Sequence, residues 1–160
     1  MARVFLYAPQ DFRNLCAISR TLEVFGQTEC FVFDPHRLIR ERYGKSRTRE
    51  QRVVSSGAFQ KIRWNRVEEP AAFLSSYAGR VVATVAATDA ADVTRFRFAE
   101  TDLLLFGSES QGLPDALVAS CGGQVTIQSP GQTQSLNLAV AFGIVLFECQ
   151  RQLAVLGTPA

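Results

Sequence analysis

Residues 103–114 read LLLFGSESQGLP and contain the pattern that decides the fold. Four consecutive apolar residues predict a short buried strand, and the glycines at positions 107 and 112 predict a tight turn after it. Pro114 then suits the first turn of a helix over residues 114–120. In open α/β sheets, ligands bind beyond the carboxyl ends of the strands. These twelve residues therefore predict an α/β sheet with a binding site at the turn.

The same alternation of strands and helices continues along the chain. Short apolar, β-branched or aromatic runs predict strands at 3–7, 30–34, 59–64, 81–85, 102–106 and 124–127. Helical spacing predicts helices over 14–26, 68–77, 114–120 and 135–153, with Asn14 and Ser135 as expected N-caps. Because no repeat or linker interrupts this order, we expect one α/β domain over residues 1–160 with a mostly parallel sheet.

Composition excludes several protein classes. Apolar residues make up 47% of the 160 residues, which argues against disorder. No apolar run approaches the roughly 20 residues that cross a bilayer, and the N-terminus has no signal-peptide pattern. The four cysteines form no CxxC pair, and His36 is the single histidine. We therefore expect reduced thiols, no metal site and a cytoplasmic location.

Basic residues are concentrated in one segment. Residues 37–66 contain ten Lys or Arg residues against Glu41 and Glu50, whereas the whole chain has a formal net charge of only +2. Arginine predominates, and its planar fork suits phosphate groups. The segment therefore predicts a polyanion-binding surface, with Arg47, Arg49 and Arg52 as candidate RNA contacts. A solvated basic loop is the alternative interpretation.

Common nucleotide-binding and hydrolase motifs are absent. The chain has no Gly-Lys-Ser/Thr phosphate loop and no GxGxxG after its first strand. It also has no Gly-x-Ser-x-Gly elbow, and one histidine leaves no obvious catalytic triad.

The last predicted helix is apolar around most of its circumference between residues 136 and 147. A surface helix of a lone domain needs only one apolar stripe. We therefore expect this helix to contact both the sheet and a second subunit, with Phe142 and Phe147 at the interface. A long core helix within one subunit is the alternative.

Three segments of the chain resemble the motifs of a known family. Residues 14–21 (NLCAISRT), 106–114 (FGSESQGLP) and 135–141 (SLNLAVA) resemble motifs one, two and three of the SpoU (TrmH) branch of the SPOUT RNA methyltransferases. Their order and spacing also match, and residues 55–58 (SSGA) are similar to a Ser-x-Gly-Ala segment of many members. The resemblance covers essentially the whole chain.

This resemblance implies transfer of a methyl group from S-adenosylmethionine to a ribose 2'-hydroxyl in RNA. It also implies a C-terminal deep trefoil knot, which general topology rules would not predict, and a homodimer. Carried over by motif, the cofactor-binding positions are Thr84, Gly107, Ile127, Ser135, Leu136 and Asn137, and the polar active-site positions are Asn14, Arg20, Glu109, Ser135 and Asn137. Because guanidinium rarely gives up a proton, we interpret Arg20 as a clamp for phosphate and ribose rather than as the base.

The chain departs from the family pattern at two places. Cys16 replaces the usual glycine of motif one, and Gln128 and Ser129 replace the usual Pro-hydrophobic pair after the strand that precedes motif three. Among substrates the chain's size is similar to compact members that act on the tRNA wobble nucleotide, whereas residues 55–58 resemble members acting elsewhere in tRNA or on rRNA. A catalytically silent RNA-binding module of the same fold and a small-molecule enzyme with an open sheet are the competing hypotheses.

Overall fold

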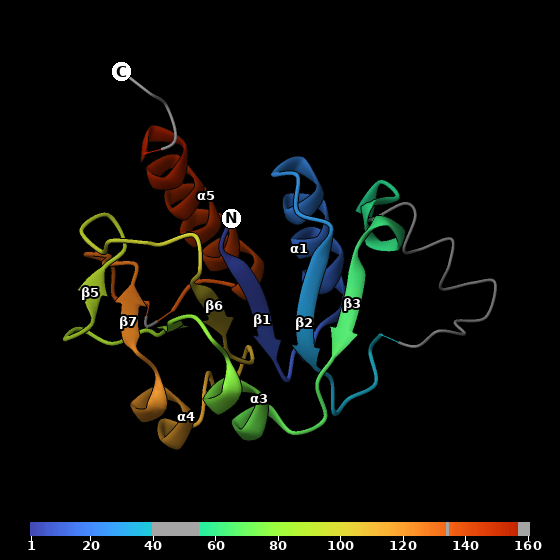
Figure 1. The fold of residues 1–160 in the computed structure, drawn as a ribbon, viewed down its shortest axis with the longest axis horizontal. Helices are drawn as coiled ribbons and strands as arrows, with labels where there is room; N and C mark the ends of the chain where they lie inside the picture. The colour runs from blue at the N-terminus through green and yellow to red at the C-terminus, as the bar shows by residue number, and fades with distance from the viewer. Residues whose placement is uncertain (40–54, 134, 157–160) are drawn as a thin grey trace.

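The structure is a computed structural model of the chain. It describes residues 1–39, 55–133 and 135–156. The described residues form a seven-stranded parallel sheet in the order β3-β2-β1-β6-β4-β7-β5 (Figure 1). Its strands are β1 (Arg3–Tyr7), β2 (Glu29–Phe33), β3 (Arg63–Arg66), β4 (Val81–Thr84), β5 (Ala91–Asp92), β6 (Leu103–Phe106) and β7 (Gly123–Thr126). The expected α/β class with a parallel sheet is confirmed, while the knot stays a prediction.

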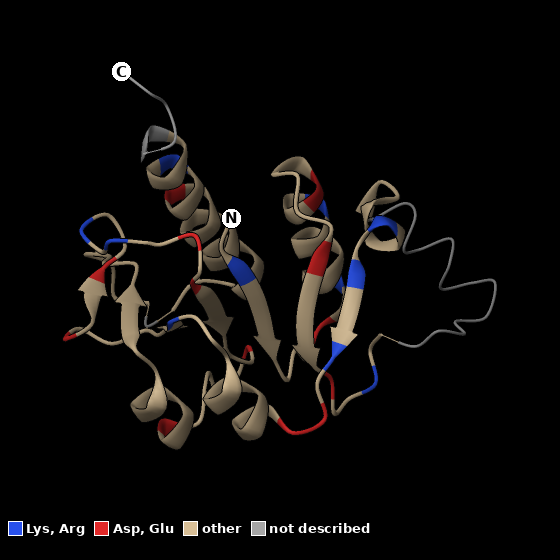
Figure 2. Cartoon of the chain, viewed as in Figure 1, with Lys and Arg blue, Asp and Glu red and all other residues tan. Residues whose placement is uncertain are grey.

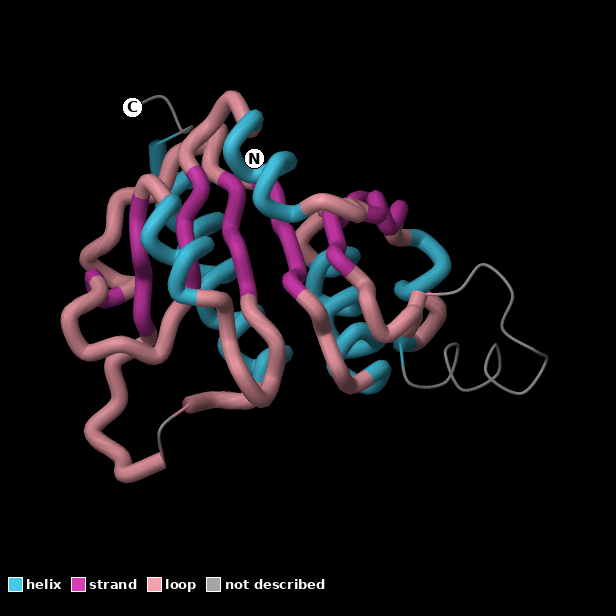
Figure 3. Tube along the Cα trace, turned by 90° about the horizontal axis from the view of Figure 1, so that it is seen from below, coloured by secondary structure: helices cyan, strands magenta, loops and turns pink. Residues whose placement is uncertain are grey.

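Helices cover both faces of this sheet, on either side of the row of strands in Figure 3. The helical elements are α1 (Phe12–Val24), the 3-10 turn η1 (Ala58–Lys61), α3 (Pro70–Ser76), α4 (Asp115–Ser120) and α5 (Leu138–Leu156). The pleat divides each central strand between the two layers, because successive side chains point to opposite faces. Leu104 and Phe106 of β6 pack with α1 and α5, whereas Leu103 and Leu105 pack with α3 and α4.

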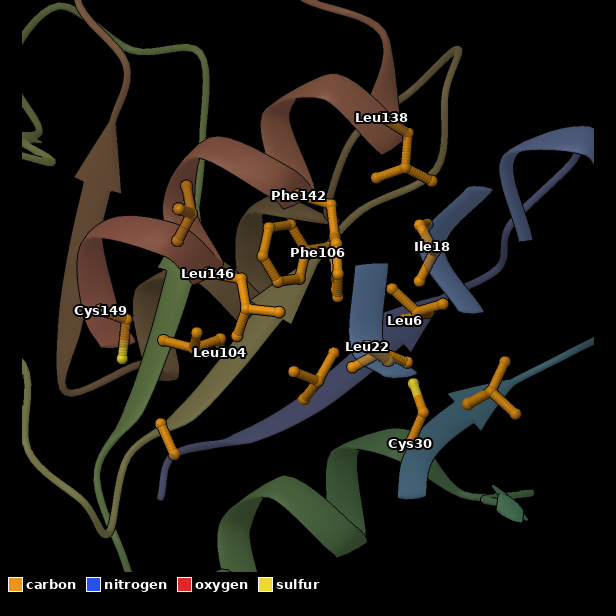
Figure 4. Close-up of a cluster of buried hydrophobic side chains, with 14 of the residues drawn as sticks. Leu6, Ile18, Leu22, Cys30, Leu104, Phe106, Leu138, Phe142, Leu146 and Cys149 are labelled. Carbon is orange, nitrogen blue, oxygen red and sulfur yellow. The ribbon is translucent and has the colours of Figure 1, made fainter. Parts of the chain in front are cut away.

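The layer that contains α1 and α5 forms the larger core. Figure 4 shows Leu6, Leu104 and Phe106 of the sheet beneath Ile18 and Leu22 of α1 and Leu138, Phe142 and Leu146 of α5. The rings of Phe106 and Phe142 are 4.9 Å apart between centroids. Phe142 is 0% exposed, so its expected place at a subunit interface is wrong: it belongs to the core of its own chain.

The thiols lie as their residue types suggest. Cys16, Cys30, Cys121 and Cys149 are all free, and three of them are buried. Burial raises the pKa of Cys149 to about 12 and raises that of Cys30 still further. These thiols therefore serve as apolar packing groups, because a thiol with a raised pKa is a poor nucleophile.

Two helix starts differ from the expected ones. The cap of α1 is Asp11, whose side chain accepts a hydrogen bond from the Arg13 amide, and Asn14 lies inside the first turn. The cap of α5 is Asn137, whose Oδ1 accepts from the Ala139 amide at 2.9 Å, so Ser135 precedes the helix. In both cases another side chain with an acceptor oxygen stands nearer to the free amides of the first turn.

The segment expected as a strand at 59–64 is divided. Ser55 Oγ accepts a hydrogen bond from the Phe59 amide, and Gly57 has a φ of 81°, which together start the turn η1. Phe59 and Ile62 are both buried, and this spacing of three residues belongs to a helical turn. The strand itself begins at Arg63.

Among residues 1–39, 55–133 and 135–156, no helix is both long and apolar enough to span a bilayer.

Candidate active site

The strand order reverses between β1 and β6. From β1 the chain builds β2 and β3 toward one edge, and the later strands fill the other side. The loop after β1 leads to α1 on one face of the sheet, and the loop after β6 leads to α4 on the opposite face. Such a switch point leaves a crevice at the carboxyl ends of the strands, which is where α/β proteins bind their ligands.

Glu109 joins the two loops that diverge at this switch point. Its Oε2 accepts a hydrogen bond from the Gln10 amide at 2.8 Å, and its Oε1 accepts from the Asp11 amide at 3.1 Å. The same Oε1 accepts from Asn14 Nδ2 at 2.8 Å. Ala8, just before these amides, has a φ of 49°, a left-handed conformation that costs an alanine on the order of 1 kcal/mol. The carboxylate therefore holds a strained loop in place.

Asn14 and Asn137 extend this contact to α5. Asn14 is only 8% exposed, and its Oδ1 accepts a hydrogen bond from Asn137 Nδ2 at 3.0 Å. Asn137 in turn caps α5 through its Oδ1. Three of the expected active-site residues, Asn14, Glu109 and Asn137, thus form one connected chain of hydrogen bonds, which we call the Asn–Glu–Asn cluster. Hydrogen bonds in such chains polarise and strengthen one another.

The expected cofactor-binding positions stand on adjacent strands. Thr84 pairs in register with Phe106 of β6 on one side and with Val125 of β7 on the other. Gly107 and Ile127 directly follow these neighbouring strands, so the three positions lie at one end of the sheet. Ser135 and Leu136 are exposed just before α5, next to Asn137.

Gly107 is required by the tight turn that the sequence predicts after β6. A Cβ at this position would lie 2.2 Å from the carbonyl carbon of Gly112, because the turn closes on itself. Ser108 and Gly112 exchange two backbone hydrogen bonds of 3.0 Å across that turn. The glycine therefore permits the turn to close, and a bulkier side chain would disturb the loop that carries Glu109.

Arg20 lies apart from the cluster. It is exposed, and it follows Asn14 by six residues of α1, about 9 Å of helix rise. Within the described part of the chain no hydrogen bond or ion pair is recorded for Arg20. The structure therefore does not bring Arg20 together with Asn14, Glu109 and Asn137 in one chain.

The expected RNA contacts at Arg47, Arg49 and Arg52 lie outside the described residues. Of the basic segment 37–66, the structure describes the exposed residues Arg37, Lys61, Arg63 and Arg66. Figure 2 shows basic positions in η1, in β3 and in the loop that follows β2.

One contact was not anticipated from the sequence. Asp92 accepts a hydrogen bond from the Gln128 amide at 3.3 Å and two more from Thr94, so it anchors the segment after β7. Hydrogen bonds from Thr94 are also the main cause that lowers the pKa of Asp92. The Asp-x-Thr pattern is a signal for the local turn, but no sequence pattern indicates the contact with Gln128.

Comparison with known proteins places the chain in a family. A model of the SpoU rRNA methylase family matches residues 1–147. A tRNA (guanosine(18)-2'-O)-methyltransferase of Thermus thermophilus is 32% identical over 143 residues, which are 87% of this chain and 69% of the relative. A 23S rRNA (guanosine-2'-O-)-methyltransferase of Acinetobacter baylyi is 30% identical over 146 residues, 89% of this chain and 56% of the relative.

Solved structures agree with this match. A structure described as giving insight into the 2'-hydroxyl methylation of C/U34 on tRNA superposes with a TM-score of 0.82 at 30% identity and covers 97% of both chains. An S-adenosylmethionine-bound rRNA methyltransferase of Sinorhizobium meliloti gives a TM-score of 0.77 at 28% identity, over 95% of this chain and 56% of the other.

Replacing Glu109 tests whether it positions the site or takes up a proton. We expect Glu109→Ala to lower the free energy of unfolding by about 1–3 kcal/mol, because two amides and Asn14 lose their acceptor. The turnover rate should fall together with the free energy of unfolding, while the pH dependence of the residual rate keeps its shape. Ser110→Ala, an exposed change in the same loop, is the matched control. Loss of the acidic limb of the pH–rate profile at unchanged stability would instead identify Glu109 as the base.

Proposed function

Because this chain belongs to the SpoU rRNA methylase family, we propose that it transfers a methyl group from S-adenosylmethionine to a ribose 2'-hydroxyl of RNA. The Asn–Glu–Asn cluster at the switch point of the sheet is the observation that carries this proposal. It places three polar residues of the family motifs together where an α/β sheet binds its ligand.

We favour tRNA as the substrate. The Thermus relative acts on tRNA, and the structure that concerns C/U34 matches this chain along nearly its whole length. The Acinetobacter relative acts on 23S rRNA, which keeps rRNA as the second candidate. We further propose that residues 1–160 act as one domain, in the cytoplasm, and that the basic segment 37–66 contacts the RNA.

Mapping of ribose methylation tests this function directly. In total RNA from a strain that lacks the gene, we expect one or a few 2'-O-methyl nucleotides to disappear from tRNA. The purified protein should restore them with S-adenosylmethionine. Loss confined to rRNA would select the second candidate, and an unchanged methylation map with no transfer in vitro would reject the function.

An unsatisfied hydroxyl marks the proposed cofactor site. Thr84 Oγ1 is buried at the end of β4 and has no hydrogen-bond partner among the described residues. A buried polar group without a partner is costly, so this hydroxyl fits a site that a polar ligand completes. We propose that S-adenosylmethionine binds beside Thr84, Gly107 and Ile127 and against the turn at Ser135, Leu136 and Asn137.

Thr84→Val provides a test in which the affinity for the cofactor should fall while the stability of the ligand-free protein is kept. Valine keeps the branched shape but removes the hydroxyl, so the affinity for S-adenosylmethionine should fall about two- to tenfold, the effect of one hydrogen bond. The ligand-free protein should lose no stability, because an unsatisfied group has been removed. Calorimetry and thermal unfolding measure the two effects, with the exposed Thr88→Val as control. Unchanged affinity together with a lower melting temperature would show that the hydroxyl serves the fold alone.

The chemistry of the transfer requires alignment more than acid–base groups. S-adenosylmethionine, when bound, would supply an activated methyl group to the ribose oxygen, with the sulfonium becoming a neutral thioether and the hydroxyl proton passing to water. Asn14 and Asn137 are held rigidly enough to fix the walls of the site, and Arg20 can bind a phosphate or ribose with its planar fork.

An exposed apolar surface supports a homodimer. Val140, Ile144 and Phe147 form one stripe of α5 and are 49%, 38% and 55% exposed. Val24 of α1 is 72% exposed, and the rings of Phe25 and Phe147 are 6.4 Å apart, so the two helices share this surface. Contiguous exposed apolar patches mark interfaces, and self-association is the commonest kind. We propose that a second copy of the chain covers it.

Such a dimer gives Arg20 a place in the mechanism. Arg20 and Val24 are four residues apart on α1 and therefore lie on the same face of the helix. When a second copy covers that face, Arg20 points toward the partner rather than toward Asn14 of its own chain. We propose that each site takes its arginine from the other subunit.

Mixed dimers test this arrangement. We expect Arg20→Ala and Asn137→Ala each to reduce the rate by orders of magnitude as pure proteins. A dimer containing one chain of each kind should regain about half of the wild-type activity, because one of its two sites combines intact parts of both chains. Phe147→Asp, which should yield monomers, checks the interface itself. A dead mixed dimer would place Arg20 in the site of its own chain.

A further inference from the structure

A second basic site lies at the far end of α5. A cavity of about 370 Å³ is lined by Thr94, Arg95, Phe96, Arg97, Arg151 and Gln152. Asn137 stands at the start of α5 and Gln152 near its end, so the cavity is about 22 Å of helix rise away from the Asn–Glu–Asn cluster. Figure 2 shows basic positions both in the loop that follows β5 and in the last turns of α5.

The loop that carries two of these arginines is fixed in place. Gln152 Oε1 accepts a hydrogen bond from the Phe98 amide at 3.1 Å, and its Nε2 donates to the Phe96 carbonyl at 2.9 Å. Arg80 Nη2 donates to the Arg97 carbonyl at 2.7 Å. The backbone around Arg95 and Arg97 is thus anchored to both α5 and the sheet. Because little backbone entropy remains to be lost on binding, the loop is prepared for a ligand.

The charge of the cavity is positive. Arg151 forms an ion pair with Glu148 at 2.7 Å. Arg95 also lowers the pKa of Asp92, but the hydrogen bonds from Thr94 lower it more. In the described part of the chain, no ion pair joins Arg95 or Arg97 to a carboxylate. Both are exposed, so their guanidinium groups can turn toward an anion. Guanidinium binds phosphate oxygens with two parallel hydrogen bonds, which makes phosphate the fitting ligand.

The aromatic residue of the cavity does not offer a free surface for a base. Arg80 lies over the Phe96 ring at 4.8 Å, and the Phe98 ring is 4.9 Å away. A ring that is covered in this way serves as a wall of the cavity. The ligand is therefore recognised through charge and not through base stacking, which is the mode of contact that proteins use on nucleic-acid backbones.

We propose that this cavity binds phosphate groups in the backbone of the substrate RNA, about 22 Å from the methylation site, independently of nucleotide sequence. The inference rests on the proposed function, and it adds a docking point to that function. Because RNA carries a phosphate at every nucleotide, an RNA seated in the active site can present phosphates at this distance.

The experiment compares Arg95→Gln, Arg97→Gln and the double variant with Arg3→Gln, an exposed arginine outside the cavity that gives the same loss of charge. Binding of an unmodified tRNA transcript is measured over a series of salt concentrations. We expect each single cavity variant to reduce the log–log salt slope by about 0.7–0.9, the value for one lost phosphate contact, and the double variant to reduce it by about twice as much. The KM for tRNA should rise with kcat and S-adenosylmethionine affinity unchanged, and Arg3→Gln should match wild type.

Three results would overturn the inference, and they are distinguishable. If wild type methylates tRNA but the cavity variants keep its salt slope and KM, the docking point is rejected and the function stands. If inorganic phosphate shifts NMR resonances of Arg95 and Arg97 while tRNA affinity is the same in all variants, the cavity is a small-anion site. If wild type neither binds nor methylates any RNA, the proposed function itself fails.

Discussion

The three hydrogen bonds that the Glu109 carboxylate accepts are the contact on which the geometry of the site depends. The strands β1 and β6 are neighbours, yet their following loops turn to opposite faces of the sheet. Nothing in the strand pairing itself holds those loops together beyond the ends of the strands. Glu109 does so by accepting from two amides of the first loop and from Asn14. Because hydrogen bonds to a charged group contribute about 1.5–3 kcal/mol each, this one side chain can offset the strain at Ala8.

The positions of the helices follow from the same contact. Glu109 orients Asn14, Asn14 orients Asn137, and Asn137 caps α5. The first turn of α5 is thereby joined to the first turn of α1, while Leu138 and Phe142 pack beneath them on Phe106. The polar cluster sets the direction of α5 at one end. At the other end Gln152 ties the helix to the loop after β5. A long apolar helix, which hydrophobic burial alone would leave free to slide, is fixed at both ends.

Most of the sheet could be predicted from local pattern, because buried parallel strands are short apolar runs. β1 matches its prediction residue for residue, and β6 differs by one residue. Errors arose where a tertiary contact overrides a local preference. Ser135 is a good cap by residue type, but Asn137 takes that role because it also reaches Asn14. The short strand β5 has no signal in sequence, since it exists only through its pairing with β7.

For the candidate site, too, the sequence predicts some features and misses those that depend on tertiary contacts. Motif order was enough to predict that Asn14, Glu109 and Asn137 belong together, and the structure joins them directly. It was not enough to assign their roles. Gly107 is required because its turn closes on Gly112, while its place beside the cofactor stays a prediction. Phe142 and Phe147 are both apolar residues of one helix, and only their angular positions separate a core residue from an exposed one.

The hydrogen bonds within the Asn–Glu–Asn cluster fix the positions of its residues. The Glu109 carboxylate accepts from two amides of the loop after β1 and from Asn14. The side chains of Asn14 and Asn137 are hydrogen-bonded to each other, and Asn137 also accepts a hydrogen bond in the first turn of α5. The cluster therefore holds a fixed geometry at the site. For a methyl transfer that needs an oxygen in line with a carbon–sulfur bond, fixed geometry is a valuable property, because correct orientation alone can lower a barrier by several kcal/mol. The exposed guanidinium group of Arg20 complements this fixed geometry, because it can reorient to bind a phosphate or ribose in the site.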